Sequence, residues 1–130
     1  MATFLLDSSV LIDTINGKKG RGQMLEDLLR NGHVLACCSI NVTEVFAGLR
    51  PHEEVRTLDL LYSLQYYPVT FPIARLAGLL KRDYARKGTT LATTDVTIAA
   101  VALHHEITLI TDNIKHYPMR ELNLYPLPTA

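Results

Sequence analysis

Short apolar segments that end on polar residues and alternate with helical segments constrain this chain more than any other feature of its sequence. Residues 4–6 run directly into Asp7, and residues 107–110 run into Thr111 and Asp112. Apolar runs of this length, closed by turn residues, are typical of buried strands. Strands that alternate with helices favour a parallel sheet covered on both faces. The sequence therefore predicts an α/β fold with a central, mostly parallel sheet flanked by helices.

Apolar periodicity places the other elements. A helix capped by Asp or Ser is expected to follow the first strand. The remaining expected helices cover residues 24–30, 40–49, 51–66, 73–87 and 96–104, and the remaining strands cover residues 34–38 and 123–126, with an extended piece at 67–70. Since no repeat, linker or charge block interrupts the pattern, we expect residues 1–130 to form one domain, which is long enough to bury a core.

Charge balance limits how the chain can attract a polyanion. The sequence has 13 basic and 13 acidic residues, so its formal net charge is zero. A nucleic acid would have to be held by a local basic patch. Candidates are Lys18, Lys19 and Arg21 in a glycine-rich loop, and Arg82 and Arg86 on an expected helix. The alternative for all five is an ordinary solvated surface.

Targeting signals and cysteine usage point to the cytoplasm. No apolar run approaches the roughly 18–20 residues of a membrane span, and residues 1–7 lack a positively charged leader. Cys37 and Cys38 are adjacent on an expected strand, so their side chains point to opposite faces and are poorly placed to bond to each other. No second Cys or His pair has the spacing of a zinc site. We expect a cytoplasmic protein in a reducing compartment, with no membrane partner.

Four carboxylates stand at positions that a parallel sheet would bring together. Asp7 and Asp112 follow strands, and ligands of such sheets bind beyond the carboxyl ends of the strands. Glu44 lies on a helix face otherwise made of small or apolar residues, and Asp95 opens the most apolar helix. Each has a structural alternative: helix capping for Asp7, turn chemistry for Asp112, an exposed surface for Glu44 and a favourable first-turn charge for Asp95.

Taken together, the four carboxylates favour a cation site. Like charges gathered at one edge would repel and raise one another's pKa unless a cation neutralised them. Oxygen ligands without Cys or His suit Mg²⁺ or Mn²⁺ rather than zinc. Mg²⁺ held by few carboxylates keeps waters, and it commonly serves phosphate chemistry. The sequence thus suggests a divalent metal site that acts on phosphate.

Four motifs together resemble a known family. They are LDSSVLID at residues 6–13, SINVTEV at 39–45, DVTIAA at 95–100 and LITDNIKHY at 109–117. In this order and spacing they resemble the PIN-domain ribonucleases and, within them, the VapC toxins of bacterial and archaeal toxin–antitoxin pairs. The resemblance covers nearly the whole chain. It implies a single PIN-like domain and a metal-dependent endoribonuclease that cuts RNA phosphodiester bonds.

The resemblance also implies site residues. Asp7 and Asp95 would be the principal metal ligands, and Glu44 would bind the metal through water or orient the attacking water. The fourth position is Asp112 or Asn113: the family register, Thr-x-Asn or Thr-x-Asp counted from Thr111, favours Asn113, whereas carboxylate chemistry favours Asp112. The metal would be Mg²⁺, with Mn²⁺ as an alternative.

Neighbouring residues and partners follow from the same resemblance. Ser8 and Ser9 match the small polar residues that follow the first Asp, and would hold a metal-bound water or a phosphate oxygen. Thr111 opens the last motif, and Tyr117 stands where the family usually has Phe. The implied partners are the RNA substrate, a second copy of the chain and a small cognate antitoxin of the VapB type, whose tail blocks the acidic cleft.

Two other functions compete with the nuclease. A non-catalytic PIN-like module would bind RNA or a protein without cutting, and it need not require Mg²⁺, so a metal titration separates it from the nuclease. A phosphoacceptor signalling domain would need paired acids after the first strand and a lysine after a late strand. Here the first strand ends on a single acid, so the signalling domain fits poorly.

Overall fold

The computed structural model describes residues 1–127, so the expected domain end at residue 130 lies outside the described residues. One five-stranded sheet runs through them in the order β3-β2-β1-β4-β5, and every neighbouring pair is parallel. The predicted α/β fold with a central parallel sheet is confirmed. The strands are β1 (Thr3–Leu6), β2 (Val34–Cys38), β3 (Gln65–Tyr67), β4 (Thr108–Thr111) and β5 (Leu124–Pro126).

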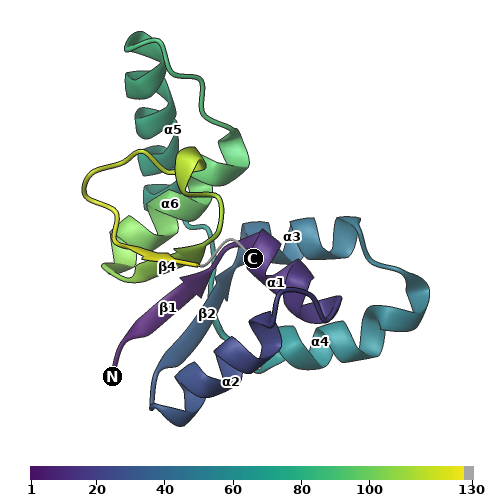
Figure 1. Ribbon diagram of the computed structural model, residues 1–130. Coiled ribbons are helices and arrows are strands. Elements are labelled where there is room, and N and C mark those ends of the chain that lie inside the picture. The colour runs from purple at the N-terminus through teal and green to yellow at the C-terminus, as the bar shows by residue number, and fades with distance from the viewer. Residues whose placement is uncertain (128–130) are drawn as a thin grey trace.

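Helices cover both faces of the sheet, as expected for parallel strands. Two of them, α5 (Phe71–Arg86) and α6 (Thr93–His105), pack on one face. Four others cover the opposite face: α1 (Ser8–Ile15), α2 (Arg21–Arg30), α3 (Ser39–Ala47) and α4 (Glu54–Tyr62) (Figure 1). Two short 3₁₀ helices, η1 (Pro51–Glu53) and η2 (Ile114–His116), complete the described elements. No helix of the described residues is long and apolar enough to cross a membrane.

The strands supply two separate cores because successive side chains alternate between the faces. Leu5 of β1 packs on the side of α5 and α6, whereas Phe4 and Leu6 pack on the side of α1 and α2. Cys38 and Cys37 divide in the same way, and both thiols are free, as the sequence predicted. A sheet buried on both faces is held rigidly, so the ends of its strands are fixed in space.

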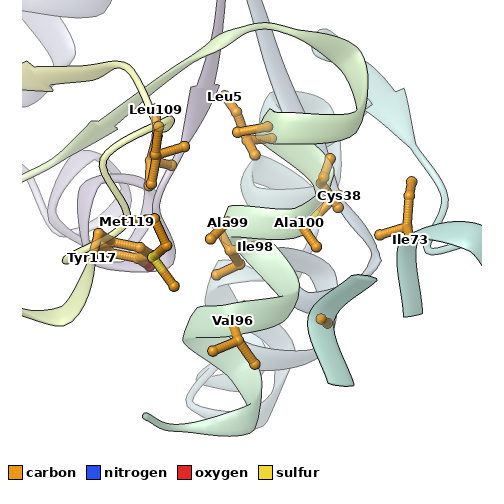
Figure 2. Packing of buried hydrophobic residues seen from close by; sticks show 14 of the residues in the cluster. Leu5, Cys38, Ile73, Val96, Ile98, Ala99, Ala100, Leu109, Tyr117 and Met119 are labelled. Atoms are coloured by element: carbon orange, nitrogen blue, oxygen red, sulfur yellow. The ribbon is translucent and has the colours of Figure 1, made fainter. Parts of the chain in front are cut away.

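The most apolar predicted helix is the most buried one. Residues Val96–Ala102 of α6 are almost fully inaccessible, and they pack between the sheet and α5. Figure 2 shows Ile98 and Ala99 of this helix facing Tyr117 and Met119, which follow η2. This packing holds the first turn of α6, which carries Asp95, at one place beside the sheet.

The bounds of several predicted elements differ from those in the structure. The helix expected over residues 51–66 ends at Tyr62, and Gln65–Tyr67 form the edge strand β3 instead. The extended piece predicted at 67–70 therefore overlaps β3 only at Tyr67. The bounds of β3 depend on its backbone pairing with β2, which the local periodicity of the sequence does not contain. The helix expected from residue 24 begins at Arg21, directly after Gly20, whose φ of 66° lies in the left-handed region.

Candidate active site

Three carboxylates gather at the carboxyl edge of the sheet. Asp7 follows β1 directly, Glu44 lies on α3 just beyond β2, and Asp95 lies in the first turn of α6. Parallel strands present these ends at one edge. The charges of Asp7 and Glu44 both act on Asp95, so the three side chains share one electrostatic environment. We call Asp7, Glu44 and Asp95 the acidic centre.

Asp7 is held by two hydrogen bonds that connect different elements. Its Oδ1 accepts a hydrogen bond from the backbone N–H of Ser8 at 2.8 Å, which makes it the N-cap of α1. Its Oδ2 accepts from the hydroxyl of Thr111, at the end of β4, at 2.7 Å. The side chain is almost buried, and each oxygen keeps a further lone pair. Capping and a site role are therefore compatible for this residue.

Ser8 orients the second carboxylate. Its hydroxyl donates to Oε1 of Glu44 at 2.6 Å and accepts from the side-chain amide of Asn41 at 3.0 Å. Asn41 in turn accepts the backbone N–H of Cys38 at 2.7 Å and is fully buried. Sequence reasoning did not single out Asn41. The available signal was its position three residues after the strand end, which is the spacing of a capping box.

Asp95 carries a charge that no strong cation neutralises. Burial raises the pKa of Asp95 above its usual range, and the charges of Asp7 and Glu44 act in the same direction. Among the described residues, its one ion-pair partner is the exposed His116, whose Nδ1 lies 3.4 Å from Oδ2 of Asp95. The charge of His116 opposes the rise in the pKa of Asp95. Within residues 1–127, no Lys or Arg lies within ion-pair distance of any acid of the acidic centre.

Asp112 has the opposite environment. It accepts a hydrogen bond from the hydroxyl of Ser9 at 3.0 Å, and Lys19 and Arg21 lie 3.4 Å and 3.7 Å from its Oδ2. Although burial acts to raise it, the Ser9 and Lys19 contacts hold the pKa of Asp112 below its usual range. Lys19 also pairs with Asp13 at 3.5 Å. Asp112 is thus already neutralised by basic side chains.

Asn113, the other candidate for the fourth position, adjoins the same region. Its backbone N–H donates to the hydroxyl of Thr111 at 2.9 Å, and its exposed side chain donates to Ser9 at 3.5 Å. Thr111 therefore bridges Asp7 and Asn113. The structure brings both candidates, with Ser8, Ser9 and Thr111, to the edge where the acidic centre lies.

The five basic candidates divide into three groups. Lys19 and Arg21 contact Asp112, and Arg21 is buried there. Lys18 is exposed at the rim of a separate cavity next to α1. Arg82 and Arg86 are exposed on α5, and Arg82 pairs with its neighbour Asp83. In the described part of the chain, no ion pair joins Lys18, Arg82 or Arg86 to the acidic centre.

The acidic centre fits a hard divalent cation. Its donors are all oxygen, and its negative charge lacks a Lys or Arg counter-ion among the described residues. No three Asp, Glu, His or Cys side chains of residues 1–127 converge closely enough to enclose one ion. An ion here would be held by one or two carboxylates and by waters, which is how proteins commonly bind Mg²⁺. Zinc, which prefers four close ligands with nitrogen or sulfur, fits poorly.

Fold and site together define the chain as a small parallel α/β domain with an acidic edge, and comparison assigns its family. The model of the PIN domain matches residues 4–121. The chain belongs to the PIN-domain family, as its motifs predicted. Ribonuclease VapC19 of Mycobacterium tuberculosis is 31% identical over 116 residues, which cover 88% of this chain and 92% of that protein. Within the family, the chain is therefore of the VapC type.

Solved structures agree with this assignment. A DNA-bound VapBC from Salmonella typhimurium gives a TM-score of 0.83 over 97% of this chain and 98% of the matched chain, at 22% identity, and so supports the fold. A toxin–antitoxin complex from Klebsiella pneumoniae is 27% identical, with a TM-score of 0.75 over 98% of this chain and 100% of the matched chain.

Proposed function

We propose that this chain is an endoribonuclease that hydrolyses RNA phosphodiester bonds with a divalent metal ion, as the toxin of a type II toxin–antitoxin pair. The observation that carries the proposal is the acidic centre: three carboxylates that share one electrostatic environment and lack a Lys or Arg counter-ion, in a chain of the PIN family. The ribonuclease name of its VapC relative supports the choice of RNA.

Each residue of the centre has a proposed role. Asp7 and Asp95 would hold the metal, and Glu44 would bind it through water or orient the attacking water. A divalent ion held at this site would supply an activated water and would stabilise the charge that develops on the phosphate and the leaving oxygen. The all-oxygen donor set supports Mg²⁺, with Mn²⁺ as the alternative. Thr111 fixes the direction of Asp7, and Ser8 fixes that of Glu44.

For the fourth position we propose Asn113. Its side chain is exposed toward solvent, where a substrate arrives, whereas Asp112 is already occupied by Lys19 and Arg21. Asp112 would then act as the anchor of Ser9 and of the basic loop. The exposed cations Lys18, Lys19, Arg82 and Arg86 are the candidate RNA contacts, while Arg21 serves the Asp112 cluster.

Partners and location belong to the same proposal. We infer a small VapB-like antitoxin, because the structural relatives include VapBC and toxin–antitoxin complexes. We further propose a homodimer, a cytoplasmic location and a single PIN domain over residues 1–130. These three proposals rest on the family resemblance.

The deciding experiment is cleavage of total cellular RNA by the wild type and by Asp7→Asn, with Mg²⁺ or with EDTA. Asn is as good an N-cap as Asp, so the variant should fold. We expect Mg²⁺-dependent cleavage by the wild type and none by Asp7→Asn. Asp59→Asn, which changes an exposed carboxylate on α4, is the matched control and should cleave normally.

Two results would reject the proposal. Normal cleavage by Asp7→Asn would remove Asp7 from the metal site. A folded wild type that binds neither Mg²⁺ nor Mn²⁺ would favour the non-catalytic binding module instead.

A further inference from the structure

The hydroxyl of Tyr117 has no role in the apolar core that surrounds its ring. Tyr117 is 2% exposed, and its ring lies beside Met119 and faces Ile98 and Ala99 of α6 (Figure 2). A phenylalanine would fill the same volume. The hydroxyl, which adds a polar group to a buried place, therefore requires a separate explanation.

That hydroxyl lies at the acidic centre. The hydroxyl lies close enough to the carboxylates of Asp7 and Asp95 to interact with both, and the charge of Glu44 also acts on it. Yet it makes no hydrogen bond of normal geometry with any described group. A buried hydroxyl without a hydrogen-bond partner destabilises a folded protein, so its position beside two carboxylates requires an explanation other than packing.

This hydroxyl is a hydrogen-bond donor at neutral pH, because the ordinary pKa of a tyrosine is about 10. Within residues 1–127, the other hydrogen bonds and ion pairs of Asp7 and Asp95 do not link the two acids. The backbone N–H of Ser8 and the hydroxyl of Thr111 bind Asp7 but not Asp95, and the exposed His116 pairs with Asp95 but not with Asp7.

We propose that Tyr117 is a positioning residue of the acidic centre. Its hydroxyl donates to the Asp7–Asp95 pair, directly or through one water, and holds the two carboxylates at a separation that suits a divalent cation. This inference rests on the proposed metal-dependent function. Groups that hydrogen-bond metal ligands typically change metal affinity 10- to 100-fold when removed.

The test compares Tyr117→Phe with Tyr84→Phe. Tyr84 contacts the same core from α5, but its hydroxyl donates to the carbonyl of Pro118 at 3.3 Å, so its removal is a matched control. Calorimetry measures Mn²⁺ affinity without RNA, and thermal unfolding in EDTA measures the stability of the metal-free protein. RNA cleavage at increasing Mn²⁺ gives the half-maximal metal concentration and the kcat at saturation.

For Tyr117→Phe we expect Mn²⁺ to bind about tenfold more weakly and the half-maximal concentration to rise by about the same factor. The kcat at saturating Mn²⁺ should stay near the wild-type value, and the Tm in EDTA should not fall. Tyr84→Phe should bind Mn²⁺ like the wild type.

Unchanged or tighter Mn²⁺ binding by Tyr117→Phe would overturn the inference, as would a lower Tm with unchanged affinity, which would mean that the hydroxyl serves packing alone. In either case, a wild type that binds Mn²⁺ and cleaves RNA would leave the proposed function standing. A wild type that binds no Mn²⁺ would overturn both.

Discussion

At the scale of single residues, identical side chains at one sheet edge have opposite electrostatic environments. Asp95 is partly buried beside two other acids, and burial raises its pKa. Asp112 lies against Lys19 and Arg21, and its pKa is lowered by its Ser9 and Lys19 contacts despite burial. Among the described residues, the first carboxylate therefore has only His116 as an ion-pair partner, whereas the second has both Lys19 and Arg21.

This difference predicts that Asp95→Asn stabilises the metal-free protein. Because the folded-state pKa of Asp95 lies above its unfolded value, ionisation of Asp95 costs stability at pH 7. The cost disappears as the pH falls below the ordinary Asp pKa of about 3.9. In EDTA at pH 7 we expect a higher Tm for Asp95→Asn than for the wild type, with a difference that shrinks toward acid pH, measured as Tm across a pH series.

Asp59→Asn, at an exposed site on α4, serves as the control and should show no such gain. A less stable Asp95→Asn protein in EDTA at pH 7 would show that the Asp95 charge is compensated in the folded state. The same variant should lose RNA cleavage, so the stability gain and the activity loss have one cause.

At the scale of elements, the glycine-rich loop before α2 is a fixed turn that delivers two basic side chains to Asp112. Gly17, Lys19 and Gly20 all have positive φ, between 57° and 66°. This path places Lys19 beside Asp112 and Asp13, and it starts α2 early enough for Arg21 to reach Asp112. The sequence predicted a basic loop, but only the path of its backbone shows that Lys19 and Arg21 bind Asp112.

The loop predicts opposite effects for two Gly→Ala changes. Gly20→Ala places a Cβ in the left-handed region and should destabilise the protein by about 1–2 kcal/mol. Gly22→Ala lies inside α2, where an added Cβ meets no atom within 4 Å, and should stabilise by roughly 0.5–1 kcal/mol. Urea denaturation measures both changes. Equal effects of the two substitutions would mean that the backbone at Gly20 is not constrained.

At the scale of the whole molecule, the sheet brings together groups from both ends of the chain. The Thr111 hydroxyl that binds Asp7 belongs to a residue 104 positions later in the chain. The hydroxyl of Ser9 donates to Asp112, which lies 103 positions later. The acidic centre also draws on α3 and α6, which pack on opposite faces of the sheet. Its geometry therefore depends on the complete fold, and metal binding should be coupled to folding.

This coupling predicts that Mg²⁺ or Mn²⁺ raises the Tm of the wild type. A ligand that binds only the folded state adds about 2.7 kcal/mol at one hundred times its Kd. Asp7→Asn should show little or none of this increase, while Asp59→Asn should show it in full. Differential scanning calorimetry with added metal, against NaCl of equal ionic strength, makes the measurement. An equal Tm increase in Asp7→Asn would mean that the metal binds elsewhere.

Local pattern was sufficient for most of the fold. Residues 34–38 were predicted as a strand with the bounds that the structure has, and the helix predicted at 96–104 is the buried α6. Such elements can be predicted from the sequence because burial of one face of a helix or strand produces a regular spacing of apolar residues along the chain. The extended piece predicted at 67–70 overlaps β3 (Gln65–Tyr67) only at Tyr67, because the bounds of β3 are set by its pairing with β2, which no local window contains.

For the site, the sequence by itself determined which chemical groups are present and that strand ends carry Asp7 and Asp112. It also determined the family, through four motifs in order. Tertiary structure alone decided that Lys19 and Arg21 neutralise Asp112, that Asn41 supports Ser8, and that the Tyr117 hydroxyl lies beside Asp7 and Asp95. The physical reason is that a periodic pattern relates residues that are close in the chain, whereas charges and hydrogen bonds join residues that are close in space and can be far apart in the chain.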